Sequence, residues 1–173
     1  MVRPGTVRRV HAAVLGVAER GGPGALTMEG IAAEAGVGKQ TLYRNWTSVH
    51  AILFDALVGD ETHSPDSPEG ETVEELLRAA IDEISTEPRC SLLRMLAASI
   101  QTDDDVARVF HARLLAPQIA HIQRIVRSAG AKDPRQATEL LLAPIFYRWF
   151  MRLPQFQASE LREHVRTVLP PTL

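Results

Sequence analysis

The sequence has little of what marks secreted and membrane proteins. Its single cysteine, Cys90, excludes a disulfide within the chain and fits a reducing compartment. The longest apolar stretch, residues 140–151, contains Arg148 and is too short to cross the ~30 Å hydrocarbon core of a bilayer. Arginines near the N-terminus are not followed by a continuous apolar segment, so we expect no signal peptide. These absences predict a cytoplasmic protein without a membrane partner.

Sequence motifs of enzymes and of metal sites are also absent. The chain has no Walker loop, no HExxH, no GxSxG and no cluster of cysteine and histidine. His111 and His121 are ten residues apart and would not share a helix face. We therefore predict no catalytic residue, no metal and no other cofactor. A helical enzyme is the alternative to a binding protein.

Hydrophobic periodicity predicts helices throughout the chain. No segment alternates with the two-residue period of a half-buried strand, whereas apolar residues recur at spacings of three and four in residues 7–17 and 73–84. Residues 60–71 are polar, with two prolines and a glycine, which is typical of a linker. The predicted fold is all-α, with an N-terminal three-helix domain in residues 1–58 and a C-terminal helical bundle in residues 59–173.

Prolines and caps set the expected limits of the later helices. Asp103 should begin a helix, and Pro117 should kink or divide it because proline lacks the N–H donor. Another helix is expected from Asp133 through Met151, and the last helix follows Pro154.

Charge is distributed unevenly around a net charge of -2. Residues 1–50 hold six basic and three acidic side chains, whereas the remainder holds thirteen basic and eighteen acidic ones. A basic N-terminal part on an acidic body is typical of a DNA-binding module joined to a module with another role. A chance excess of a few charges is the alternative.

Residues 27–53 contain the pattern of two short helices joined by a tight turn. An apolar helix from Met28 to Ala35 is followed by Gly36-Val37-Gly38, and a second helix is expected from Lys39. Thr27 is the expected N-cap of the first helix. Such a pair forms a helix-turn-helix, which places its second helix in the DNA major groove. Two short helices of an ordinary bundle are the alternative.

The side chains expected on the outer face of the second helix favour DNA binding. Leu42 is the apolar residue that would seat this helix on the domain. Glutamine pairs with adenine through two hydrogen bonds, lysine donates to guanine, and the threonine methyl contacts the thymine methyl. The side chains expected to point outward are Lys39, Gln40, Thr41 and Arg44.

The spacing of residues from Val10 to Leu53 adds a second argument. The residues that carry the pattern are Ala13, Ala18, Thr27, Ile31, Ala32, Glu34, Ala35, Gly36, Val37, Thr41, Leu42, Tyr43, Trp46, Ser48 and Leu53. In order and spacing, over about a quarter of the chain, this segment resembles the N-terminal domain of TetR/AcrR-type one-component transcriptional regulators. The chain length and the helical remainder are also similar to that family.

The resemblance implies a role for individual residues at DNA. It implies phosphate contacts by Thr27 and by the Tyr43 hydroxyl. The residues implied to face bases are Lys39, Gln40 and Thr41. The residues implied to lie near the phosphate backbone are Arg44, Asn45 and Trp46. For Tyr43 and Trp46, packing between helices is the alternative.

Two positions depart from the family pattern. The family commonly has a phosphate-binding lysine where this chain has Val49, and a serine or threonine cap where it has Gly38. Loss of one cation should flatten the salt dependence of DNA affinity by about one unit of slope. Arg3, Arg8 and Arg9 are candidates to compensate by reaching along the duplex, and a solvated N-terminal arm is the alternative.

Residues 140–151 are apolar on nearly every face of the expected helix, so this helix needs a partner on the side away from the core. Self-association through it and the last helix would form a two-fold dimer, with two recognition helices ~34–36 Å apart for a palindromic site. The resemblance implies the same assembly, and a central helix buried inside a monomer is the alternative. The predicted interface residues are Leu141, Ile145, Arg148, Trp149, Leu161, Val165 and Val168.

The resemblance also implies that residues 1–58 form a helix-turn-helix DNA-binding domain and that residues 59–173 form a ligand-binding and dimerisation domain. It implies an effector pocket there for a small apolar or amphipathic molecule. Each candidate residue has ordinary core packing as its alternative. The candidates are Met95, Leu96, Ser99, Phe110, Leu114, His121, Ile122, Tyr147 and Phe150.

The predicted function is a ligand-responsive transcriptional repressor that binds a palindromic operator as a homodimer. The ligand would favour a conformation in which the two recognition helices no longer match the groove spacing. The alternative is a dimeric helical ligand-binding or interaction protein whose DNA-binding head has degenerated, and the valine at position 49 is its best support.

Overall fold

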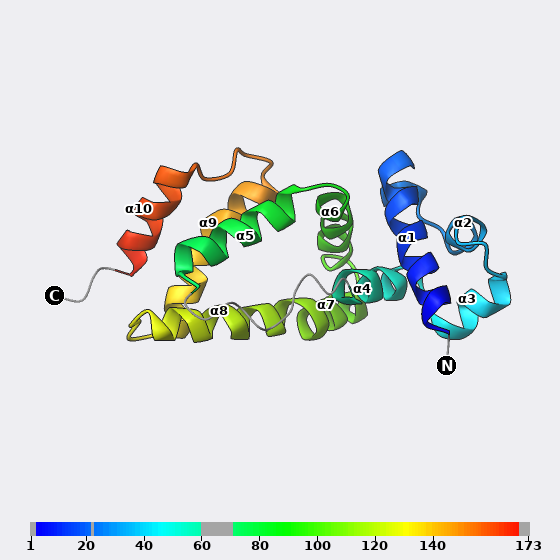
Figure 1. Ribbon diagram of the computed structural model, residues 1–173, viewed down its shortest axis with the longest axis horizontal. Coiled ribbons are helices and arrows are strands. Elements are labelled where there is room, and N and C mark those ends of the chain that lie inside the picture. The colour runs from blue at the N-terminus through cyan, green and yellow to red at the C-terminus, as the bar shows by residue number, and fades with distance from the viewer. Residues whose placement is uncertain (1–2, 22, 60–70, 170–173) are drawn as a thin grey trace. The chain divides into compact units, whose positions relative to one another are not determined.

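The computed structural model describes residues 3–21, 23–59 and 71–169, and these residues are helical without a strand (Figure 1). This confirms the predicted fold class. The predicted linker falls outside the described residues except for Glu71. None of the described helices combines the length and the apolar character needed to cross a bilayer. The helices are α1 (Pro4–Gly21), α2 (Met28–Glu34), α3 (Lys39–Asn45), α4 (Val49–Gly59), α5 (Val73–Ser85), α6 (Arg89–Ser99), α7 (Asp104–Phe110), α8 (Ala116–Ser128), α9 (Pro134–Phe150) and α10 (Ala158–Val168), with a 3₁₀ turn η1 (Pro23–Ala25) and a π-helical segment η2 (His111–Leu115).

Local sequence explains the turn between α2 and α3. The Thr27 hydroxyl accepts a hydrogen bond from the Gly30 N–H at 3.0 Å, which confirms Thr27 as the cap of α2. Gly36 adopts φ +61°, a left-handed conformation that costs glycine little and other residues more. The chain then turns into α3, for which Gly38 is the N-cap residue.

The first compact unit comprises residues 1–63 and 86–114, and so contains α1–α4 with α6 and α7. Val10 and Val14 on α1 are fully buried, as the valine spacing predicts. They share one hydrophobic core with Ile31 of α2 and Leu42 of α3. The helix-turn-helix is therefore held by tertiary packing rather than by the intrinsic stability of its short helices.

This packing unit differs from the predicted division at residues 58 and 59. Leu92 and Leu96 of α6 have no exposed surface and belong to the same core as the N-terminal helices. The physical reason is that α1 and α4 contact α6 and bury their remaining apolar side chains against it. A division of function between residues 1–58 and 59–173 stays a prediction.

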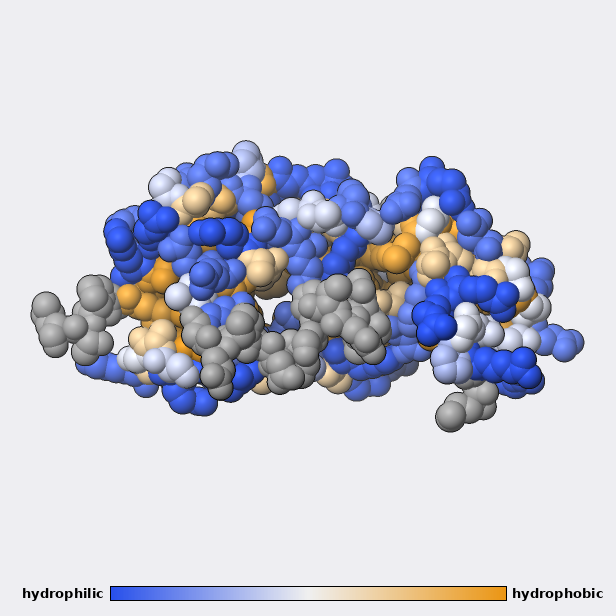
Figure 2. All heavy atoms as spheres, in the orientation of Figure 1, coloured by the Kyte–Doolittle hydropathy of each residue, from blue (hydrophilic) through white to orange (hydrophobic). Residues whose placement is uncertain are grey.

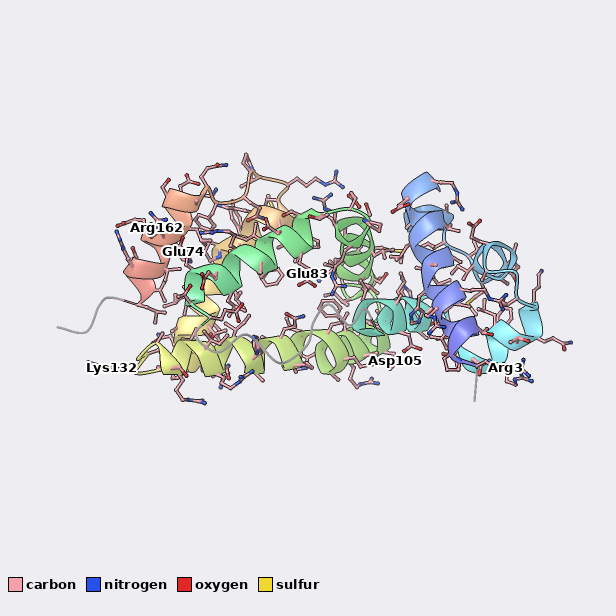
Figure 3. All side chains as sticks on the ribbon, viewed as in Figure 1. Arg3, Glu74, Glu83, Asp105, Lys132 and Arg162 are labelled. Carbon is pink, nitrogen blue, oxygen red and sulfur yellow. The ribbon has the colours of Figure 1, made fainter. Side chains whose placement is uncertain are left out.

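The second compact unit comprises residues 64–85 and 115–173, with α5, α8, α9 and α10. Its core contains Leu77 of α5, Val126 of α8, Leu141 of α9 and Leu161 of α10. At its surface, the Arg162 guanidinium of α10 lies 3.3 Å from the Glu74 carboxylate of α5, and Figure 3 labels both residues.

Helix boundaries in the second half follow the expected caps. The Asp103 carboxylate accepts hydrogen bonds from the N–H groups of Asp105 and Val106, both at 3.0 Å, and so caps α7. The predicted division near Pro117 is confirmed, because the π-helical segment η2 separates α7 from α8. A proline N–H is missing there, and the widened turn adjusts the hydrogen-bond pattern.

Candidate nucleic-acid interface

Helix α3 presents a polar face because one apolar residue fixes its rotation. Leu42 is fully buried in the core of the first unit. The side chains of Lys39, Gln40 and Arg44 are exposed, and Thr41 is half-buried. Hydrophilic residues predominate where α3 lies, at the right of Figure 2. This arrangement gives α3 donors for phosphates and base edges.

Thr27 and Asn45 lie at opposite ends of the motif. Thr27 is exposed, and a hydroxyl that accepts one bond from the backbone still has its own proton to donate to a phosphate. The Asn45 amide donates to the Thr41 carbonyl within α3 and is half-buried. Thr27 is therefore accessible for the predicted contact, whereas the Asn45 amide already has a partner in its own helix.

Tyr43 is held by an acidic residue of α2. Its hydroxyl donates to the Glu29 carboxylate at 2.9 Å. This hydrogen bond raises the pKa of Tyr43, while the backbone N–H of Glu29, followed by the Tyr43 hydroxyl, lowers the pKa of Glu29. Tyr43 is exposed, so its ring is accessible, but the hydroxyl predicted to bind phosphate has a protein partner.

Trp46 is the clearest correction among the predicted DNA residues. Its side chain is buried, and its indole N–H donates to the Asp55 carboxylate of α4 at 2.7 Å. Arg113 donates to the second oxygen of the same carboxylate at 2.6 Å. Trp46 therefore packs between helices and anchors the end of α3, which is the alternative stated for it.

Sequence reasoning missed Glu29 and Asp55, the two acidic residues that hold the aromatic side chains of this motif. Glu29 is 14 residues from Tyr43 and Asp55 is nine residues from Trp46, so each pair joins different helices. No periodic pattern within one helix predicts such pairs.

The start of α4 lacks the lysine that the family commonly has there. Val49 is half-buried and packs against the core of the first unit. The next residue, His50, makes a 3.0 Å hydrogen bond from its ring Nε2 to the Ser99 hydroxyl, and that hydroxyl donates to the Met95 carbonyl. Because Ser99 has used its proton, the His50 nitrogen is the donor. This position is therefore used for packing α4 against α6.

The structure distributes the nine predicted effector residues over different surroundings. Leu96 and Leu114 are buried in the core of the first unit, with Met95 and Phe110 beside it. Ile122 is buried in the core of the second unit. The Ser99 hydroxyl is hydrogen-bonded to His50. His121 is half-buried, with its Nδ1 2.6 Å from the Arg124 guanidinium. Tyr147 and Phe150 are exposed on α9.

The dimer residues predicted on α9 also need correction. Leu141, Ile145 and Trp149, with Leu161 of α10, are buried inside the second unit, so they cannot form the outer face. The physical reason is the helical repeat, which turns residues spaced by four toward one side. Arg148, Val165 and Val168 are half-buried. The exposed large apolar residues of α9 and its following turn are Leu140, Phe146, Tyr147, Phe150, Met151 and Leu153.

Comparisons with known proteins agree with this geometry. Residues 12–56 match the family described as bacterial regulatory proteins, tetR family, and residues 70–168 match a Tetracyclin repressor-like C-terminal domain. The HTH-type transcriptional regulator YdeS of Bacillus subtilis (strain 168) is 23% identical over 171 residues, covering 93% of this chain and 86% of that protein.

Two solved structures share the fold over nearly the whole chain. The TetR family transcription regulator SCO0332 superposes with a TM-score of 0.75 and 24% identity, covering 96% of this chain and 98% of that one. GusR of Salmonella enterica has a TM-score of 0.75 and 20% identity, covering 99% of each chain. With the α3 face described above, the two family matches show that the chain belongs to the tetR family of bacterial regulatory proteins and is a DNA-binding regulator of transcription.

Proposed function

We propose that this protein is a homodimeric repressor that binds a palindromic operator in the cytoplasm and has no catalytic role. The observation that carries the proposal is the polar, basic face of α3, with Lys39, Gln40 and Arg44 exposed around a buried Leu42. A surface that served only to pack against protein would not leave these donors in solvent.

The proposed contacts divide into two classes. Lys39, Gln40 and Thr41 lie in the first turn of α3 and read base edges in the major groove. Thr27 and Arg44 bind phosphates and fix the position of the motif on the duplex. The exposed arginines at positions 3, 8 and 9 add sequence-independent attraction.

Dimerisation is proposed through the outer face of α9. Leu140, Tyr147 and Phe150 recur at helical spacing and are 53%, 60% and 64% exposed in the single chain. Large exposed apolar side chains grouped on one helix face are typical of a protein-protein interface. The proposed interface therefore uses exposed residues of α9 in place of the buried residues that the sequence predicts.

The effector is proposed to be a small apolar or amphipathic molecule that binds the C-terminal domain. The support is the match of residues 70–168 to a Tetracyclin repressor-like C-terminal domain. Release of DNA requires that the effector bind more tightly to a conformation in which the two heads no longer fit the operator.

A gel shift with the DNA just upstream of the protein's own gene tests the assignment of α3. The double variant Lys39→Ala/Gln40→Ala should lose sequence preference, with a weakening of at least about tenfold, because two base-reading side chains are removed at ~1–3 kcal/mol each. The matched control is Gln101→Ala/Lys132→Ala, which removes the same residue types from exposed positions outside the helix-turn-helix and outside α9. An unchanged shift for the α3 variant, or an equal loss for the control, would refute the assignment.

A further inference from the structure

Glu29 is an acidic side chain placed on the face that the proposed function assigns to DNA. It lies in the first turn of α2, two residues after Thr27, and it is exposed. Its carboxylate is 2.9 Å from the Tyr43 hydroxyl. Neither the base-reading role of α3 nor the core of the first unit requires a carboxylate there.

The chemistry of the Tyr43 hydroxyl makes its two partners exclusive. A phenolic hydroxyl has one proton and therefore donates one hydrogen bond. In the free protein this bond goes to Glu29. A phosphate oxygen can only accept hydrogen bonds, so Tyr43 donates to a phosphate only after its bond to Glu29 is broken.

The negative charge of Glu29 also disfavours the binding of a phosphate. Its pKa lies below the ordinary value because its own backbone N–H, then the Tyr43 hydroxyl, stabilise the ionised form. The positive charge of Lys39 also lowers this pKa, to a smaller extent and through space. An ionised carboxylate beside a phosphate repels it and offsets part of the attraction by Lys39.

We propose that Glu29 limits the affinity of the α3 face for DNA. Its carboxylate accepts the hydrogen bond that the Tyr43 hydroxyl would otherwise donate to a phosphate, and its negative charge offsets part of the attraction of Lys39 for that phosphate. The inference rests on the proposed DNA face and adds an autoinhibitory contact within it. The penalty applies to every duplex, since phosphates are common to all sequences. Glu29 therefore sets how strongly the protein binds DNA, while Lys39, Gln40 and Thr41 set which sequence it prefers.

The direction in which DNA affinity changes when Glu29 is removed distinguishes this role from a positioning role. If Glu29 oriented the Tyr43 ring for DNA, its removal would weaken binding. If Glu29 competes with phosphate, its removal tightens binding. Glu29→Ala removes both the acceptor and the charge, whereas Glu29→Gln removes the charge and keeps an acceptor for the hydroxyl.

Fluorescence anisotropy of the full chain measures the effect on two labelled duplexes, one of mixed sequence and one from upstream of the protein's own gene. At about 50 mM salt we expect Glu29→Ala to tighten binding about fivefold per bound head on both duplexes, and Glu29→Gln somewhat less. The gain should shrink at about 200 mM salt, where exposed charges are screened.

The Tyr43→Phe background isolates the hydroxyl. Without the phenolic proton, Glu29→Ala retains only the gain from charge removal, which we expect to be about twofold. The matched control is Glu19→Ala, which removes the same charge from an exposed position in the last turn of α1, a turn that Figure 1 shows at the opposite end of that helix from α3. Thermal unfolding of each variant verifies that the domain is folded.

The outcomes separate the two proposals. If the wild-type chain binds neither duplex at low salt, the proposed function fails. If the wild-type chain binds and folded Glu29→Ala binds equally or more weakly, the role of Glu29 is refuted. An equal gain in Glu19→Ala, or an equal gain with and without the Tyr43 hydroxyl, would also refute competition for that hydroxyl.

Discussion

At the scale of single residues, two aromatic side chains of one motif each donate to one acidic partner, but one is exposed and the other is buried. Tyr43 is exposed and donates to Glu29 on α2. Trp46 is buried and donates to Asp55 on α4, which also binds Arg113. A buried indole N–H needs such an acceptor, since leaving it unpaired costs ~1–3 kcal/mol. Residue type alone does not distinguish a DNA contact from an anchor.

The Tyr43–Glu29 hydrogen bond predicts a shifted tyrosine titration. The chain has two tyrosines, so Tyr147→Phe leaves Tyr43 as the single phenol. Ultraviolet absorbance should then titrate above the ordinary tyrosine pKa, and adding Glu29→Ala should lower that pKa toward the ordinary value. By linkage, the stabilisation from this bond is present below the unfolded pKa of tyrosine and is lost as pH rises through the folded pKa. Identical titrations with and without Glu29 would contradict the hydrogen bond.

At the scale of elements, the recognition helix depends on its surroundings. Helix α3 has seven residues, too few to be stable alone in water. Its position is set by Leu42 in the core, by Trp46 at its C-terminal end, and by the turn at Gly36 before it. Lys39 and Gln40 are therefore held in their exposed positions by contacts that other residues make.

Replacing glycine by alanine should have opposite effects on stability at Gly36, in the turn before α3, and at Gly5, in α1. Gly36→Ala should lower the free energy of unfolding by roughly 1–2 kcal/mol, because alanine is strained at φ +61°. A Cβ at Gly36 or at Gly5 would meet no atom within 4 Å, so crowding is not involved. Gly5→Ala in the first turn of α1 should be neutral or stabilising by up to ~0.5 kcal/mol. Urea unfolding compares the two, and equal changes at both positions would contradict this account.

At the scale of the whole molecule, regulation by a two-fold dimer requires a surface that a second copy covers. Helix α9 buries Leu141, Ile145 and Trp149 in its own unit and exposes Leu140 and Tyr147. The sequence predicts that this helix is apolar on both sides. Only the burial of individual residues shows which side faces the core and which side is exposed.

The interface proposed on the outer face of α9 predicts that one charge added there separates two copies of the chain. Tyr147→Glu should give the mass of a single chain, 19.0 kDa, by light scattering at micromolar concentration, because a buried unpaired carboxylate at an interface costs several kcal/mol. It should also weaken operator binding, since two linked heads bind more tightly than one. Gln101→Glu, which adds the same charge at an exposed position outside α9, is the control and should keep the mass of the wild type. A dimer that survives Tyr147→Glu would place the interface elsewhere.

The sequence by itself determined the helical class, the caps at Thr27 and Asp103, the division near Pro117 and the burial of Leu42. These features follow from local rules: the hydrophobic repeat, the hydrogen-bonding capacity of short polar side chains and the missing N–H of proline. Such rules act over a few residues and need no knowledge of distant parts.

Tertiary structure alone decided which side of α9 is buried, that α6 completes the core of the N-terminal helices, and which acidic residues hold Tyr43 and Trp46. Each of these depends on residues far apart in sequence that meet only after the helices pack. Hydrophobic burial does not depend on sequence separation, so periodicity identifies an apolar face but not the element that covers it.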